Sequence, residues 1–205
     1  MKPGDLLERH ADAWQVATRH PFLAAVRDGT LDPHVFATWL VQDYLFVRDE
    51  FASLVHLLPR APRSAQNLLV RALVALEAEL SWFEEHALER DLSLDATYQP
   101  ATAAYRDFLD TIAQTSFPVA ITALWAAERA YLESWTSALP GYRTYQAYVT
   151  HWANPEFESF VAELEAVTAK ALARGDLDAE AEAAFLRVAR LEHDFWEMAW
   201  SGGRA

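Results

Sequence analysis

Three acidic residues stand in aromatic stretches of the sequence, where a buried carboxylate is unfavourable unless a partner satisfies it: Asp43, Glu128 and Glu192. A carboxylate in an aromatic pocket can accept hydrogen bonds from an amine of a ligand. A carboxyl group whose pKa is raised by such a pocket can also exchange protons near neutral pH. The sequence therefore predicts recognition of a planar, nitrogen-containing ligand and general acid–base chemistry on it.

Asp43 lies in an apolar and aromatic run that we expect to be helical. At helical spacing it shares one face with Trp39, Phe46 and Glu50. The two aromatic neighbours favour a role in binding an amine. The alternative is a partly exposed acid that pairs with Arg48.

Glu128 shares a helical face with Tyr131 and Trp135, which follow it by three and seven residues. This alignment favours the wall of a pocket. The alternative is a surface acid beside Arg129. We expect Arg129 itself to form a solvated ion pair with Glu133 on the other side of the helix.

Glu192 aligns with Trp196 on a helix near the carboxyl terminus, which again places an acid in an aromatic stripe. In such a pocket its pKa should be raised. The alternative is a surface carboxylate near Arg187 or Arg190. His193 points about 100° away from Glu192 on the helix, so we expect a surface histidine there.

Together, the three acids predict one acidic, aromatic-lined cavity inside a helical bundle. A carboxylate–histidine di-iron site is a competing possibility, because Glu79 and His86 are seven residues apart and share a helical face. The sequence lacks the Glu-x-x-His pairs typical of such bundles, so we expect no metal. The further ligands of this alternative would be Glu128, His151, and Glu158 or Glu192.

The elements that must position these residues are helices, because apolar residues recur with a period of 3.6 and no convincing period of two appears. Gly29 is typical of a helix end, and Asp32 followed by Pro33 is typical of a helix start. We expect one all-α domain of seven to nine helices over residues 1–205. The expected helices are 5–19, 21–29, 33–58, 64–90, 100–113, 117–139, 142–152, 155–173 and 178–200.

Composition excludes several classes of protein. The chain has 205 residues, 52% of them apolar, which suits a single packed domain. The formal charge of −13 argues against a nucleic-acid partner. There is no cysteine, hence no disulfide and no thiolate nucleophile. We find neither the apolar core of a signal peptide nor a run long enough to span a bilayer, so we expect a cytoplasmic protein without a membrane partner.

Several stretches resemble, in order and spacing, the TenA family of thiaminase-II-like enzymes of thiamin salvage. They are HPFLAAVRDGTLDPHVFATWLVQDYLFV, EAEL, ALWAAERAYLESW and YQAYVTHWANPEF. The resemblance runs from about residue 20 to about residue 200. It implies a haem-oxygenase-like helical bundle that assembles as a homodimer or homotetramer and needs no cofactor.

The resemblance also implies roles for individual residues. Asp43 matches the aspartate that binds the exocyclic amine of a pyrimidine. Glu192 matches a glutamate that binds or protonates a ring nitrogen. Four aromatic residues match positions that line the family's site: Phe46, Tyr105, Tyr131 and Trp152.

The sequence departs from the thiaminase-II type at the nucleophile. Ala127 occupies the position of the family's catalytic cysteine, so covalent catalysis by a thiolate is excluded. A second branch of the family lacks this cysteine and carries a nearby glutamate, which Glu128 matches.

We therefore expect a hydrolase that converts thiamin-derived aminopyrimidines, either the formylamino or the aminomethyl compound, to hydroxymethylpyrimidine. Asp43, Glu128 and Glu192 are its expected catalytic residues. Two alternatives remain: a di-iron oxygenase of the same fold, and a non-catalytic pyrimidine-binding or regulatory protein.

Overall fold

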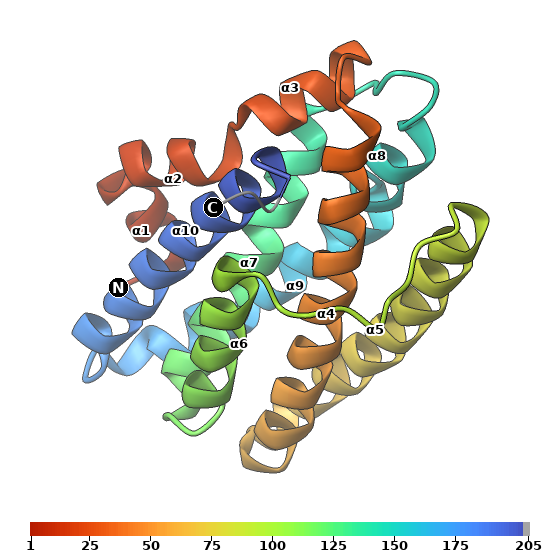
Figure 1. Cartoon of the computed structure of the whole chain (residues 1–205). Helices are drawn as coiled ribbons and strands as arrows, with labels where there is room; N and C mark the ends of the chain where they lie inside the picture. The colour runs from red at the N-terminus through yellow and green to blue at the C-terminus, as the bar shows by residue number, and fades with distance from the viewer. Residues whose placement is uncertain (203–205) are drawn as a thin grey trace. The chain divides into compact units, whose positions relative to one another are not determined.

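The computed structural model describes residues 1–202, and this part of the chain is built from α-helices and short 3₁₀ turns, without a β-strand (Figure 1). The predicted all-α fold is thus confirmed. Ten α-helices form within the described residues: α1 (Pro3–Arg9), α2 (Ala11–Thr18), α3 (Pro21–Asp28), α4 (Pro33–Leu57), α5 (Arg63–Glu89), α6 (Pro100–Ile112), α7 (Phe117–Ser137), α8 (Gln146–Trp152), α9 (Pro155–Ala171) and α10 (Asp178–Trp200).

The count exceeds the predicted seven to nine because the expected helix 5–19 is two helices, α1 and α2. The break lies at His10, whose backbone is not helical (φ −117°, ψ 32°). The His10 ring lies 2.6 Å from a carboxylate oxygen of Glu182 and packs near Phe185. Contacts with residues far along the chain thus accompany a break that the local pattern does not reveal.

The boundaries of α3 and α4 follow the predicted signals. Gly29 ends α3 in the left-handed conformation (φ 73°), and a Cβ at this position would also collide with the ring of Tyr142. The side chain of Asp32 accepts a hydrogen bond of 2.8 Å from the backbone N–H of His34, which caps the amino terminus of α4.

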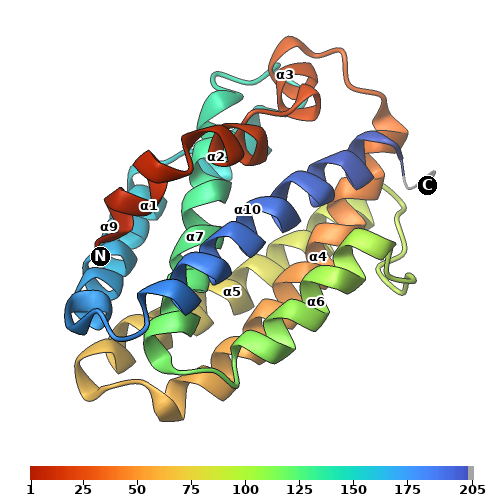
Figure 2. The ribbon, with the colours of Figure 1, turned by 90° about the vertical axis from the view of Figure 1, so that its left-hand side faces the viewer.

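The described chain divides into two compact units. The first unit comprises residues 1–31 and 118–197, and the second unit comprises residues 32–117 and 198–202. In the first unit, α1 packs against α9, as Figure 2 shows. In the second unit, the 3₁₀ turn Leu58–Arg60 follows α4, and α4 contacts both α5 and α6.

None of the helices within residues 1–202 combines the length and the apolar character needed to cross a membrane.

Candidate active site

Asp43 is buried on α4, with only 1% of its surface exposed. Arg48, the base considered as its surface partner, is exposed and donates a hydrogen bond of 2.7 Å to the hydroxyl of Tyr98. The alternative of a partly exposed acid is therefore wrong. A buried carboxylate requires hydrogen-bond donors or a ligand to balance the lost hydration.

Aromatic rings surround this part of the second unit. The ring of Trp39, one turn before Asp43, lies 5.0 Å from the ring of Phe36 and 6.1 Å from that of Phe83. The Phe46 ring lies 4.6 Å from the ring of Tyr105, at an interplanar angle of 55°. Helices α4 and α6 therefore bring Phe46 and Tyr105, two of the predicted substrate-binding residues, into direct contact.

Glu50 is a second buried carboxylate on α4, with 4% of its surface exposed. It lies on the same helix face as Asp43, seven residues further on. The spacing indicated this alignment in the sequence, although no role followed from it.

Gln42 is the residue in this region whose importance the sequence did not indicate. Its side chain is buried and is bonded at both ends to the segment before α6. Its Nε2 donates to the carbonyl of Thr97 (3.0 Å), and its Oε1 accepts from the backbone N–H of Gln99 (2.9 Å). Gln42 thereby fixes the start of the helix that carries Tyr105.

Tyr98 fastens the same segment to α4. Its hydroxyl accepts from Arg48 and donates to Asp49 at 2.9 Å, and the guanidinium of Arg106 lies 4.7 Å from the ring centre. Burial raises the pKa of the Asp49 carboxyl, and the hydrogen bond from Tyr98 opposes this rise.

Glu192 is buried on α10 in the first unit, with 4% of its surface exposed. The alternative of a surface carboxylate is therefore wrong. One turn further on, the ring of Trp196 lies parallel to that of Tyr131 (5.9 Å, 12°). Tyr131 also makes an edge-to-face contact with Trp152 (5.2 Å, 85°), so α7, α8 and α10 bring two further predicted substrate-binding residues together.

Glu128 is half-buried on α7, and Ala127 beside it is buried. Arg129 serves other partners: its Nε lies 2.6 Å from the Glu133 carboxylate, and its NH1 lies 3.5 Å from that of Glu165. The predicted pair between Arg129 and Glu133 is confirmed.

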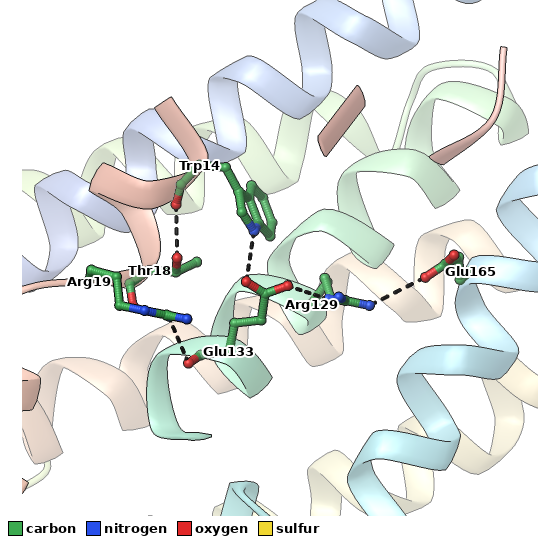
Figure 3. A network of polar contacts seen from close by, with 6 residues as sticks. All are labelled: Trp14, Thr18, Arg19, Arg129, Glu133 and Glu165. Atoms are coloured by element: carbon green, nitrogen blue, oxygen red, sulfur yellow. Dashed lines mark hydrogen bonds and ion pairs between the residues drawn. The ribbon is translucent and has the colours of Figure 1, made fainter. Parts of the chain in front are cut away.

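The Arg129–Glu133 pair belongs to a larger network, which Figure 3 shows. The indole Nε1 of Trp14 donates to the second carboxylate oxygen of Glu133 (3.0 Å), and Arg19 donates to the Glu133 carbonyl (3.2 Å). Since Glu165 lies on α9, the network joins α2, α7 and α9 and fixes the helix that carries Glu128 and Tyr131.

His193 is not the predicted surface residue. It is half-buried, its Nδ1 is buried without a hydrogen-bond partner in residues 1–202, and its ring lies 6.0 Å from the ring of His20. The Nδ1 of His20 accepts from the backbone N–H of Phe22, and its Nε2 lies 3.1 Å from Glu197. Burial lowers the pKa of His20, although Glu197 opposes this effect.

Residues 7–202 match the TENA/THI-4/PQQC family. The chain belongs to this family. A probable bifunctional TENA-E protein of Glycine max is 31% identical over 206 aligned positions, which cover 94% of this chain and 90% of the relative. An aminopyrimidine aminohydrolase of Halalkalibacterium halodurans is 27% identical, with 96% and 94% of the two chains covered.

Solved TenA structures share the fold. A TenA homologue from Pyrococcus furiosus aligns with a TM-score of 0.91 and 28% identity, covering 98% of this chain and 100% of the other. A TenA homologue from P. horikoshii aligns with a TM-score of 0.88 and 20% identity, covering 98% of this chain and 100% of its own. The family membership and the all-helical TenA fold predicted from the sequence are confirmed.

The predicted site residues of this TENA-family chain divide between its two units. Asp43, Phe46 and Tyr105 belong to the second unit. The first unit holds the other predicted residues: Glu128, Tyr131, Trp152 and Glu192. Among residues 1–202, no group of three or more histidine and acidic side chains is arranged to hold a metal ion, and Glu79 and His86, the competing di-iron possibility, belong to no such group.

Proposed function

We propose that this protein is a hydrolase of thiamin-derived aminopyrimidines and that it acts without a cysteine nucleophile. Its substrates are 4-amino-5-aminomethyl-2-methylpyrimidine or the N-formyl derivative of that compound. The similarity to an aminopyrimidine aminohydrolase over 96% of this chain supports the substrate class. The burial of Asp43 and Glu192 within aromatic surroundings is the observation that carries the proposal.

Asp43 binds the 4-amino group in this proposal. A buried carboxylate accepts hydrogen bonds from both N–H groups of an aminopyrimidine more strongly than an exposed one, because water does not compete. The face of either contacting ring, that of Phe46 or that of Tyr105, can stack on the flat pyrimidine. Fixing the ring in this way orients the substituent at C5 for reaction.

Glu192 binds a ring nitrogen or transfers a proton to it. Protonation makes the ring a better electron acceptor, which favours departure of the amine from the methylene carbon at C5. The rings of Tyr131 and Trp152 lie on neighbouring helices of the same unit and are proposed to contact the pyrimidine as well.

Glu128 takes the place of the missing thiolate. As a general base it removes a proton from water, whose oxygen forms a bond to carbon while the carbon–nitrogen bond breaks. Glu128 passes the proton it took from water to the departing nitrogen, which leaves as ammonia, and the product is the hydroxymethylpyrimidine. With the N-formyl substrate, the same attack at the amide carbon breaks the amide carbon–nitrogen bond and releases formate and the aminomethylpyrimidine, which is the substrate of the first reaction.

The family match includes residues of both units, which supports the proposal that residues 1–205 form one TenA-type domain. We also propose a cytoplasmic homodimer or homotetramer. Light scattering coupled to gel filtration measures the assembly, and a monomeric mass would contradict it.

The test is an assay of purified protein with both pyrimidines, following ammonia, formate and hydroxymethylpyrimidine by chromatography. We expect turnover in the wild type and a loss of at least about 100-fold in kcat for Glu128→Gln and Glu192→Gln. Asp194→Asn is the matched control, because Asp194 is exposed on the same helix as Glu192. Binding of the pyrimidine without turnover would instead support a binding protein.

A further inference from the structure

Thr102 on α6 carries a hydroxyl group that the protein does not use. The side chain is 1% exposed, and its Oγ1 has no hydrogen-bond partner within residues 1–202. A buried hydroxyl without a partner is unfavourable and rare in native proteins. Four other buried hydroxyls donate to a backbone carbonyl, those of Thr18, Ser53, Thr122 and Thr168. Ser134, on α7 in the first unit, shares the unpartnered state of Thr102.

The contacts between α4 and α6 show which part of α4 lies at the level of Thr102 on α6. Both helices run in the same direction, because residues further along α4 contact residues further along α6. The contacts that fix this register, all within the second unit, are Gln42 with Gln99, Phe46 with Tyr105, and Ser53 with Leu109.

Thr102 lies between the first two of these contacts on α6, and Asp43 lies between them on α4. It also belongs to the buried face of α6 that includes Tyr105 and Leu109. Thr102 is therefore near the level of Asp43 along the two helices, on the buried face of α6 that includes Tyr105.

We propose that Thr102 is a further substrate-binding residue, whose hydroxyl bonds the pyrimidine beside the group bound by Asp43. This inference rests on the proposed function, and it identifies a residue that recognises the pyrimidine ring at the same site. The 4-amino group donates hydrogen bonds, whereas the adjacent ring nitrogen N3 accepts one. A carboxylate and a hydroxyl match this pair, because the carboxylate accepts and the hydroxyl donates.

Thr102→Val separates this role from a structural one. Valine keeps the branched shape and removes the hydroxyl. Since the hydroxyl has no partner in the protein, the thermal midpoint should stay the same or rise. The KM for the aminopyrimidine should rise about fivefold to tenfold, with kcat changed less than about twofold. A structural hydroxyl would give the opposite result, a lower midpoint and an unchanged KM.

Two matched variants complete the test. Thr102→Ser keeps the hydroxyl and should retain a KM within about twofold of the wild type. Ser53→Ala removes a hydroxyl that does bond between the same two helices, so it should lower the thermal midpoint without raising KM.

Calorimetric binding of the product, 4-amino-5-hydroxymethyl-2-methylpyrimidine, and of its analogue with carbon in place of N3 identifies the contacted atom. The wild type should bind the analogue about fivefold to tenfold more weakly, and Thr102→Val should bind both compounds alike. Equal binding of the product by the wild type and Thr102→Val would overturn this inference alone. Failure of the wild type to bind the product would overturn the proposed function and this inference together.

Discussion

The indole of Trp196 lies parallel to the phenol ring of Tyr131, with ring centroids 5.9 Å apart and an interplanar angle of 12°. This stack holds the turn of α10 after Glu192 against α7, within the first unit. The stack therefore fixes this turn of α10 against α7, although these two helices are far apart in the sequence.

Trp196→Ala should lower the free energy of unfolding by about 3–5 kcal/mol, because it removes a fully buried ring from this stack. Trp196→Phe should cost less, about 1–2 kcal/mol, since it keeps an aromatic ring. Urea unfolding measures both values. Leu88→Ala is the control, because Leu88 is 82% exposed and its loss should change little. Equal effects of the two Trp196 variants would contradict this account of the stack.

The network in Figure 3 predicts unequal effects for two glutamates that bond the same arginine. Glu133→Gln removes the charge nearest Arg129, at 2.6 Å, and should lower the free energy of unfolding by about 1–2 kcal/mol. Glu165→Gln acts at 3.5 Å and should change it by less than about 0.5 kcal/mol. Thermal or urea unfolding distinguishes the two variants, and a larger loss of stability for Glu165→Gln than for Glu133→Gln would contradict this prediction.

His20 predicts a loss of stability in acid. Burial holds its pKa in the folded protein below the ordinary histidine value of about 6.5, so the unfolded chain takes up the proton first as the pH falls. The contribution is complete above about pH 6.5 and declines below it, by at most about 1.4 kcal/mol per pH unit. Protonation of Nδ1 would also remove the acceptor for Phe22, while Glu197 would favour the charged ring and His193 would oppose it.

The measurement is the free energy of unfolding of the wild type and His20→Asn between pH 7.5 and pH 5. Asparagine keeps a side-chain acceptor for the start of α3 but does not titrate. The variant should show a flatter decline, and His34→Asn, which changes an exposed histidine, should follow the wild type. Parallel curves for the wild type and His20→Asn would refute this assignment.

Gln42 predicts a local effect at the start of α6. Gln42→Ala removes both of its hydrogen bonds and should speed amide exchange at Gln99, whose N–H then lacks its acceptor. Gln42→Glu keeps an acceptor for Gln99 but places an oxygen against the carbonyl of Thr97, so it should protect Gln99 while still lowering stability by about 1–3 kcal/mol. Hydrogen exchange read by NMR tests this, and equal exchange at Gln99 in both variants would argue against it.

Much of the fold could be predicted because its signals are local. The glycine after α3 and the aspartate and proline before α4 lie next to the boundaries that they set. The break at His10 could not be predicted, because the contact with Glu182 that accompanies it lies 172 residues away.

The candidate site, like the fold, could be predicted only where its signals are local. The aromatic stripes correctly indicated that Asp43 and Glu192 are buried, since burial follows from helical periodicity. The hydrogen bonds of Gln42 and the unpartnered hydroxyl of Thr102 depend on which atoms of distant segments do or do not reach these side chains. A single sequence carries no local signal for such contacts.

The most direct test of the proposed function is the hydrolysis of 4-amino-5-aminomethyl-2-methylpyrimidine by the wild type, Asp43→Asn and Glu192→Gln, followed as ammonia and hydroxymethylpyrimidine in equal amounts. Asp107→Asn and Asp194→Asn, which alter exposed acids, are the controls. We predict stoichiometric release by the wild type and both controls, and a loss of at least about 100-fold in kcat/KM for the two buried-acid variants. Undiminished turnover in Asp43→Asn or Glu192→Gln, or no turnover of this substrate and its N-formyl derivative by the wild type, would contradict the account.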